Sequence, residues 1–273
     1  MKRLFIIFAS LAAITACATT HAGSKTAGSQ QKMTLKADRI SSFATTLPVE
    51  LVITDSSSPR AHIEIPSAEL AEWIVCRLEG SELMIYPRDN AGRRLVSLSS
   101  ANPIKVTIES SAIGEIRSTS STKITCRNKR FAQSLSIGNT GSLHIEADKI
   151  DLSDSFYINN TGRFELDVKR IEAGNRIHLA NTGRIESSVE TFACRTWDSS
   201  NTGVVNISSN ITADKVSCTS TGRDNLSLEI KCVKLTISST GAGNMKFSGE
   251  ADEISVVSNG SARISTCDVR QPR

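Results

Sequence analysis

The chain has 273 residues, of which 39% are hydrophobic and 22% charged, so it has enough apolar material for a folded core. Its formal net charge is +4, and no basic stretch is interleaved with aromatic residues, which argues against nucleic-acid binding. No segment after the amino terminus is long and apolar enough to span a bilayer.

Residues 1–17 have the features of a bacterial export signal. A basic pair at positions 2 and 3 precedes an apolar run that is too short to form a mature transmembrane helix. The sequence Ile-Thr-Ala-Cys that ends at Cys17 resembles a lipobox, in which the cysteine is acylated and becomes the new amino terminus. Ordinary signal-peptidase cleavage after Ala18 or Ala22 is the alternative. We therefore expect an exported cell-envelope protein, anchored by lipid to the outer membrane on its periplasmic or its outer side.

Residues 18–32 are rich in Thr, Ser, Gly and Gln, which predicts a flexible tether. Segment 33–112 alternates apolar and polar residues at 49–53, 63–65, 83–85 and 104–108, which predicts a β-rich head with four strands. Residues 67–75 predict one short helix, with Ser67 as its cap and Leu70 and Ile74 facing inward. Residues 89–94 predict a turn. We expect the head to cap the repeat region that follows, because the end of a repeat stack needs a cover.

Residues 113–267 form a tandem repeat in which a polar corner, Asn-Thr-Gly in its clearest copies, returns every 19 to 21 residues. An irregular first coil, 113–131, has Ser120-Ser121 at the corner position. Seven later corners carry a glycine: Gly141, Gly162, Gly183, Gly203, Gly222, Gly241 and Gly260. Apolar and polar residues alternate on both sides of each corner, which predicts strands with one buried face.

A coil of this length is too short to contain a crossover helix. Stacking of equivalent positions at about 4.8 Å therefore predicts an all-β fold, a parallel β-helix, followed by a short tail at 268–273. Proline is absent between residues 104 and 271, as expected where nearly every strand is central.

The corner residues are expected to hold the coils together rather than to bind a ligand. Two residues before the glycine, four successive corners carry an asparagine: Asn139, Asn160, Asn181 and Asn201. Stacked amides hydrogen-bond from coil to coil and satisfy polar groups at a buried bend. A glycine in every corner indicates either a positive φ or a lack of space for Cβ.

An export signal with a lipobox, a β-rich head, and coils with Asn-Thr-Gly or Ser-Thr-Gly corners together resemble one bacterial family. That family is described as putative auto-transporter adhesin, head GIN domain, and the resemblance covers Ile40 to Ile264. It implies a right-handed, single-stranded β-helix in an envelope protein with an adhesin role. The glycine-rich start of the head in many members is replaced here by Phe-Ala-Thr-Thr-Leu-Pro at 43–48, so no head-specific function is carried over.

Outward positions near the corners provide a candidate ligand surface, which consists of Arg163, Arg184, Tyr157 and His178. The arginines suit an anionic glycan and the rings suit a sugar platform, whereas the alternative for the arginines is a solvated row of salt bridges. The expected partner is a surface glycan or another envelope protein. The open C-terminal coil is a further candidate surface, for pairing with another subunit or coil.

An enzyme that degrades polysaccharides, a lyase or a hydrolase, is the alternative function. Catalysis of this kind needs acidic or basic residues that converge in a groove. Coils of nearly constant length leave no insertion to wall such a groove, and the four histidines are scattered along the chain. We therefore predict a non-catalytic protein with no cofactor and no metal.

Six cysteines remain if Cys17 is acylated: Cys76, Cys126, Cys194, Cys218, Cys232 and Cys267. An even number in an oxidising compartment permits up to three disulfides. However, Cys126 and Cys218 fall in inward columns and suit a hydrophobic core as free thiols. Their spacing matches no zinc motif.

Overall fold

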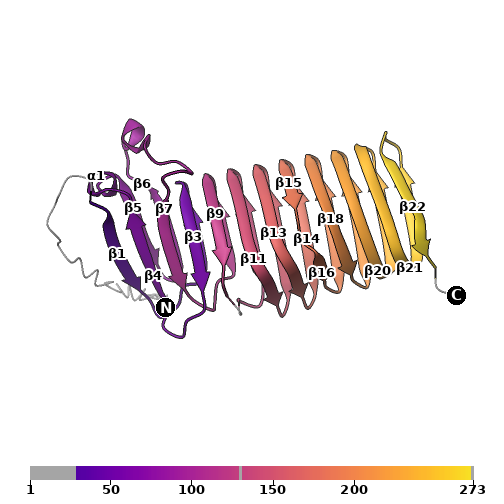
Figure 1. Ribbon diagram of the computed structural model, residues 1–273, viewed down its shortest axis with the longest axis horizontal. Coiled ribbons are helices and arrows are strands. Elements are labelled where there is room, and N and C mark those ends of the chain that lie inside the picture. Colours follow the sequence, from indigo (N-terminus) through magenta and orange to yellow (C-terminus); the bar gives the residue numbers. More distant parts are fainter. Residues whose placement is uncertain (1–28, 129–130, 272–273) are drawn as a thin grey trace, which may run out of the picture.

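The computed structural model describes residues 29–128 and 131–271, and Figure 1 shows them as a long stack of coils. The described strands belong to one continuous hydrogen-bonded sheet that winds around a common core. Most of the pairings are parallel, and the antiparallel pairings lie at the amino-terminal end. The prediction of an all-β parallel solenoid with a β-rich amino-terminal cap is confirmed.

Each repeat coil contributes one strand before the corner and another after it. The strands before the corner are β8 (Glu115–Ser118), β10 (Leu135–Asn139), β12 (Ser155–Asn160), β14 (Arg176–Asn181), β17 (Thr196–Asn201) and β19 (Lys215–Ser220). Those after it are β9 (Ser121–Cys126), β11 (Ser142–Leu152), β13 (Arg163–Ala173) and β18 (Val204–Thr212), and in one coil this strand is divided into β15 (Arg184–Ser187) and β16 (Thr191–Ala193). The last coils are built by β20 (Arg223–Ser239), β21 (Ala242–Ser258) and β22 (Arg263–Arg270).

The parallel register places equivalent residues of successive coils beside one another. Leu135 pairs with Phe156, which pairs in turn with Ile177. All three side chains are at most 1% exposed, because the alternation of the strand turns this column inward. Each coil therefore buries its apolar face only by stacking on its neighbours.

The head supplies two further coils, in an order that differs from the chain order. β2 (Ser42–Thr45) and β3 (Val49–Thr54) pair in parallel with β8 and β9. On their other edges they pair with β6 (Glu82–Pro87) and β7 (Ile104–Glu109), which come later in the chain but lie further out. Antiparallel strands then cover this end: β5 (Ile74–Glu79) on β6, β4 (Arg60–Ile65) on β7, and β1 (Gln31–Lys36) on β4.

The four predicted head strands are present as β3, β4, β6 and β7, whereas β1, β2 and β5 were missed. The predicted helix at 67–75 is too long, since α1 spans only Ala68–Ala71. Ser67 does cap it, because its Oγ accepts a hydrogen bond of 3.2 Å from the backbone N–H of Leu70. Ile74 is buried as expected but begins β5, because the chain there pairs with β6. The predicted turn at 89–94 overlaps a 3-10 helix, η1 (Gly92–Leu95).

Two predicted boundaries shift. β1 begins at Gln31, inside the predicted tether, because Gln31 and Lys32 pair with Ile65 and Glu64 of β4. β22 continues to Arg270, so the predicted tail at 268–273 is largely strand. Residues 1–28, and with them the lipobox at Cys17, lie outside the described residues. Among those that are described, no helix has the length and apolarity needed to cross a membrane.

Candidate functional site

The corner asparagines form a buried row of amides. The Nδ2 of each donates to the Oδ1 of the next, from Asn139 to Asn160 (2.7 Å), Asn160 to Asn181 (2.7 Å) and Asn181 to Asn201 (2.8 Å). All four side chains are at most 3% exposed. Because each amide already hydrogen-bonds to its neighbours, the geometry suits a structural link between coils.

The row ends on a buried carboxylate that the sequence did not indicate. In the next coil this column is occupied by Ser220 and not by an asparagine. Asn201 Nδ2 therefore donates to Oδ1 of Asp224, which lies four residues after Ser220 in the chain. Asp224 is 1% exposed. Burial raises the pKa of its carboxyl, and hydrogen bonds, including the one from Asn201, act in the opposite direction.

The corner glycines are required for space rather than for their backbone angles. A Cβ on any of them would lie 2.0 to 2.3 Å from a backbone carbonyl oxygen of the preceding coil, which is closer than any real contact. The described glycines with positive φ lie elsewhere: Gly80, Gly92, Gly243 and Gly249. Of the two explanations offered by the sequence, lack of room for Cβ is therefore correct and positive φ is wrong.

The predicted ligand surface is split between the two sides of the corner. Arg163 and Arg184 are neighbours in β13 and β15, whereas Tyr157 and His178 are neighbours in β12 and β14, on the other side of the corner. The two rings meet edge to face with centroids 6.4 Å apart, and burial lowers the pKa of His178. Both arginines form ion pairs with a glutamate on the same strand, Arg163 with Glu165 and Arg184 with Glu186, each with a nitrogen–oxygen distance of 2.5 Å.

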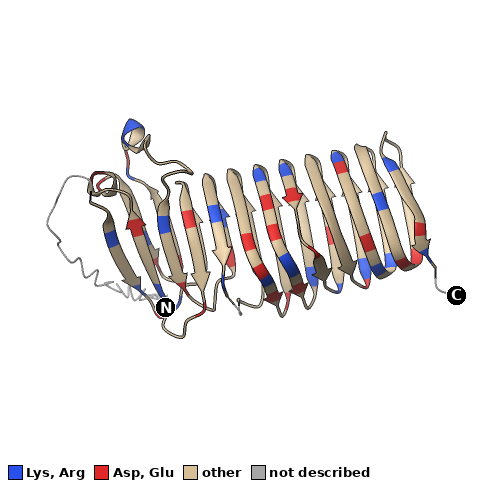
Figure 2. Ribbon diagram, viewed as in Figure 1, with Lys and Arg blue, Asp and Glu red and all other residues tan. Residues whose placement is uncertain are grey.

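One outward row of ionisable residues crosses eight neighbouring strands, and its charges alternate from Lys32 to Lys123. From β1 to β15 the row consists of Lys32, Glu64, Lys105, Glu50, Lys123, His144, Glu165 and Glu186. Figure 2 shows blue and red bands on neighbouring strands from the head into the middle of the solenoid. We call this row the charged row.

A groove of about 490 Å³ lies over the charged row where the head meets the repeat coils. Its wall is the segment 96–103, which contributes Ser100 and Pro103. This wall is fixed by the buried side chain of Leu98 and by paired backbone bonds between Ser99 and Asn102. We call this hollow the head-loop groove. The expectation that nothing walls a groove is therefore wrong, because the wall comes from the head and not from an insertion between coils.

The floor of the head-loop groove is polar and internally paired. The charged row supplies Glu50, Lys123, His144 and Glu165, and Arg163 lies beside them. His144 sits between two carboxylates, with Nε2 3.5 Å from Glu146 and Nδ1 3.5 Å from Glu165. Lys123 Nζ lies 2.8 Å from Glu146, and this hydrogen bond raises the pKa of Lys123. Of these residues the sequence singled out only Arg163 as a ligand contact.

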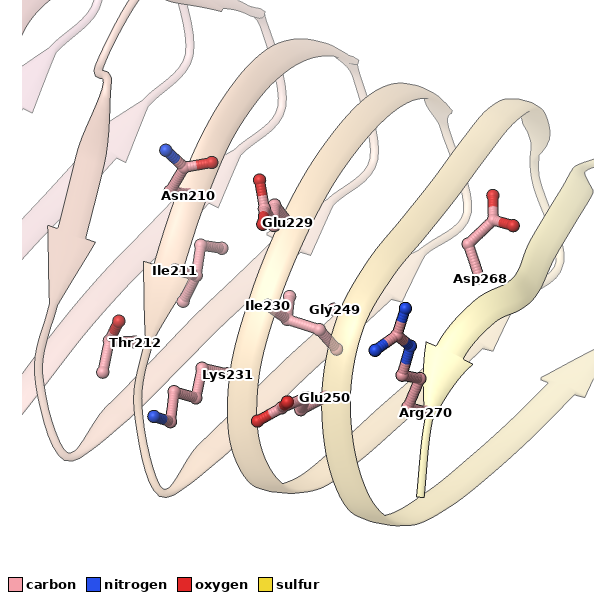
Figure 3. Close-up of a pocket in the computed structure, with 10 residues that line it drawn as sticks. All are labelled: Asn210, Ile211, Thr212, Glu229, Ile230, Lys231, Gly249, Glu250, Asp268 and Arg270. Carbon is pink, nitrogen blue, oxygen red and sulfur yellow. The ribbon is translucent and has the colours of Figure 1, made fainter. Parts of the chain in front are cut away.

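A second hollow, of about 650 Å³, lies near the open end on β18, β20, β21 and β22. Figure 3 shows Asn210, Glu229 and Asp268 along one side and Lys231, Glu250 and Arg270 along the other. The inward column of Ile211, Ile230 and Gly249, of which the two isoleucines are buried, runs between these two sides. We call this hollow the C-terminal groove. It continues up to the edge of the last coil.

The six cysteines after Cys17 are all free thiols. Cys126 and Cys218 are buried in the core, as their columns indicated. Burial raises the pKa of Cys126 to about 12, so its thiol is unreactive at neutral pH. Cys194 and Cys232 share one column but are separated by Ala213, which keeps them two coils apart.

Comparisons place this architecture among bacterial proteins of known fold. Similar solved structures include a putative adhesin from Parabacteroides merdae (12% identity, TM-score 0.64), which covers 88% of this chain and 97% of its own. The match to a putative adhesin from Bacteroides fragilis (15% identity, TM-score 0.64) covers 84% of this chain and 97% of that protein. The match to a putative lipid binding protein from Parabacteroides distasonis (18% identity, TM-score 0.51) covers 88% of this chain and 98% of that protein. At these identities the likeness concerns the fold alone.

A search of curated proteins finds no match to this chain. The model of one bacterial family, described as putative auto-transporter adhesin, head GIN domain, matches residues 38–167 and again residues 135–271. Together the two matches span nearly the whole described chain. The chain therefore belongs to the putative auto-transporter adhesin, head GIN domain family.

Proposed function

We propose that this chain is a non-catalytic, adhesin-like binding protein of the cell envelope and that its head-loop groove binds a surface glycan. The observation that carries the proposal is the groove itself, a walled hollow in which donors and acceptors alternate. Membership of an adhesin family supports a binding role and an envelope location. The lipobox at Cys17 supports a lipid anchor, which would hold this surface near a membrane.

The chemistry of the floor suits a carbohydrate. Sugar hydroxyls both donate and accept hydrogen bonds, and the groove presents the acceptors Glu50 and Glu165 beside the donors Lys123 and Arg163. Lys123 is already held by an ion pair with Glu146, and Arg163 by one with Glu165, so these two donors lose less side-chain freedom when a ligand binds. The hollow is within the size range of ligand sites, about 300 to 1,000 Å³.

Catalysis is less well supported by the same residues. A lysine that acts as a general base needs a pKa lowered towards neutrality, whereas the hydrogen bond that Lys123 donates to Glu146 raises the pKa of Lys123. The observation in favour of a polysaccharide lyase or hydrolase is His144, which lies between the carboxylates of Glu146 and Glu165. We keep this enzyme as the second candidate, because the two functions differ in a measurable product.

The test is a screen of the purified protein against host and bacterial glycans, with product analysis on the same samples. We expect binding to at least one glycan without cleavage. Ser100→Trp should abolish this binding, because a bulky ring on the wall fills the groove. Ser97→Trp is the matched control on the same loop, since Ser97 is exposed and does not line the groove, and it should bind like the wild type. Cleavage products, or equal binding by both variants, would refute the proposal.

A further inference from the structure

The two ends of the solenoid differ in how their strand edges are protected. At the amino-terminal end, the outer strand β1 exposes Lys32 and Lys36, and edge lysines discourage pairing with another chain. At the opposite end (Figure 1), no described strand pairs with the outer edge of Ile254–Ser258 or of β22. The edge Ile254–Ser258, with the sequence ISVVS, contains no lysine, proline or bulge.

The last coil also leaves inward side chains uncovered. Val256 continues the inward column of Cys218 and Ile237, which are each 1% exposed, yet Val256 itself is 42% exposed. Ile254 and Ile264 belong to inward columns too and are only partly buried. Open apolar side chains together with unpaired backbone groups are what an interior coil would present if its neighbour were removed.

We propose that a second copy of this chain covers this end, so that the last coils of the two copies pair edge to edge about a two-fold axis. Antiparallel pairing about a residue keeps inward side chains opposite inward side chains. An axis through Ser255 places Ile254 opposite Val256 of the second copy, so that apolar residues meet. Glu253 then faces Val257 of the second copy, and no like charges face each other along this edge.

The same axis crosses the coil half a turn later, near the middle of β22. The β-bulge in the pairing of β21 with β22 shifts the alternation of β22 by one residue, so Ile264 and Val269 both face the core. A two-fold axis between the halves of β22 therefore places Ile264 opposite Val269 of the second copy. Arg263 lies diagonal to Asp268 of the second copy, within the reach of cross-strand pairs. This carboxylate offsets the one like-charge contact, between Arg263 and Arg270 of the second copy.

The pairing closes on itself. Since both copies use the same surface, the assembly stops at two copies, whereas a head-to-tail contact would continue as a fibre. The head, which lies at the far end of each copy, stays accessible. The C-terminal groove reaches the edge of the last coil at Asp268 and Arg270, so the second copy would close the open end of this groove.

The test combines sedimentation with a designed cross-link. The wild type should sediment as a dimer that dissociates on dilution, and Val256→Arg should weaken the dimer at least about tenfold, because it places charge in the paired apolar column. Val256 is exposed in the single copy, so the variant should keep the thermal midpoint of a dissociated wild type. In a Cys267→Ser background, Ser255→Cys should form a disulfide-linked dimer under mild oxidation.

Ser217→Cys is the matched control, since Ser217 occupies the same outward column two coils inside the stack. It should give no cross-linked dimer. A wild type that stays monomeric at every concentration would overturn the proposal. So would assemblies larger than a dimer, a dimer that Val256→Arg leaves unchanged, or equal cross-linking at both positions.

Discussion

Replacing Asn181 by leucine tests whether the row of corner asparagines stabilises the stacking of the coils. Asn181 is 3% exposed and occupies the middle of the row. Its Oδ1 accepts from Asn160, and its Nδ2 donates to Asn201 and lies 3.0 and 3.1 Å from the backbone oxygens of Gly183 and Val204. Leucine has a similar size but removes every one of these contacts.

The size of the loss follows from which neighbours keep a partner. Asn160 Nδ2 retains the carbonyl oxygen of Gly162 at 2.8 Å, and Asn201 Oδ1 retains the backbone N–H of Gly203 at 2.9 Å. Neither neighbour is therefore left as a buried orphan, and the cost is the net value of the lost bonds. At about 1 kcal/mol for each of two amide–amide bonds and the shared backbone bonds, we expect a loss of about 2–4 kcal/mol.

Urea unfolding of Asn181→Leu and Asn225→Leu gives the comparison. Asn225 Nδ2 donates to Asn206 Oδ1 at 2.8 Å, which is the same coil-to-coil amide bond on the solvent side of the solenoid. Because water replaces that bond, Asn225→Leu should cost no more than about 0.5 kcal/mol. Equal urea midpoints for the two variants would refute the structural role of the asparagine row. If Asn181→Leu keeps wild-type stability yet loses a ligand, the row is a binding site instead.

Three further predictions use matched or pH-dependent changes. Gly183→Ala should lower the free energy of unfolding by at least about 2 kcal/mol, because the added Cβ would lie 2.1 Å from a carbonyl oxygen. Gly138→Ala should be nearly neutral, because its added Cβ would have a side-chain carbon at 3.8 Å as its nearest neighbour. Thermal unfolding of the two variants measures this difference. Burial raises the folded-state pKa of Asp224, so the folded state binds more protons and stability falls as pH rises above the ordinary pKa of 3.8. Asp224→Asn, which still accepts from Asn201, should remove this slope and be more stable at pH 7 when urea midpoints are compared across pH. Cys17→Ala should release the protein from the membrane fraction, and a wild type unlabelled by a fatty-acid analogue would contradict lipidation.

The repeat region could be predicted closely because its information is local. The glycine at each corner and the alternation around it are visible within one coil, and their recurrence gives the stacking register directly. Leu135, Phe156 and Ile177 share a column in the sequence alignment of the coils and pair in the structure. The absence of proline agrees with central strands.

The head could not be predicted to the same depth, because its strands stack in an order that the chain does not reveal. Glu50 pairs with Lys123, and these residues lie on coils that are adjacent only because the later strands β6 and β7 were placed outside β2 and β3. The charged row and the head-loop groove depend on that order. His144 therefore looked isolated in the sequence, although the structure places it between Lys123 and Glu165.

Titration calorimetry with the glycan selected by the screen tests the central claim most directly. Lys123→Ala removes a donor from the floor of the head-loop groove, whereas Lys169→Ala removes a lysine with a comparable ion pair, 2.7 Å against 2.8 Å, that does not line the groove. We predict that Lys123→Ala weakens binding at least about tenfold, that Lys169→Ala binds like the wild type, and that no product forms with any of the three proteins. Equal affinities for all three, or turnover of the glycan, would contradict the account.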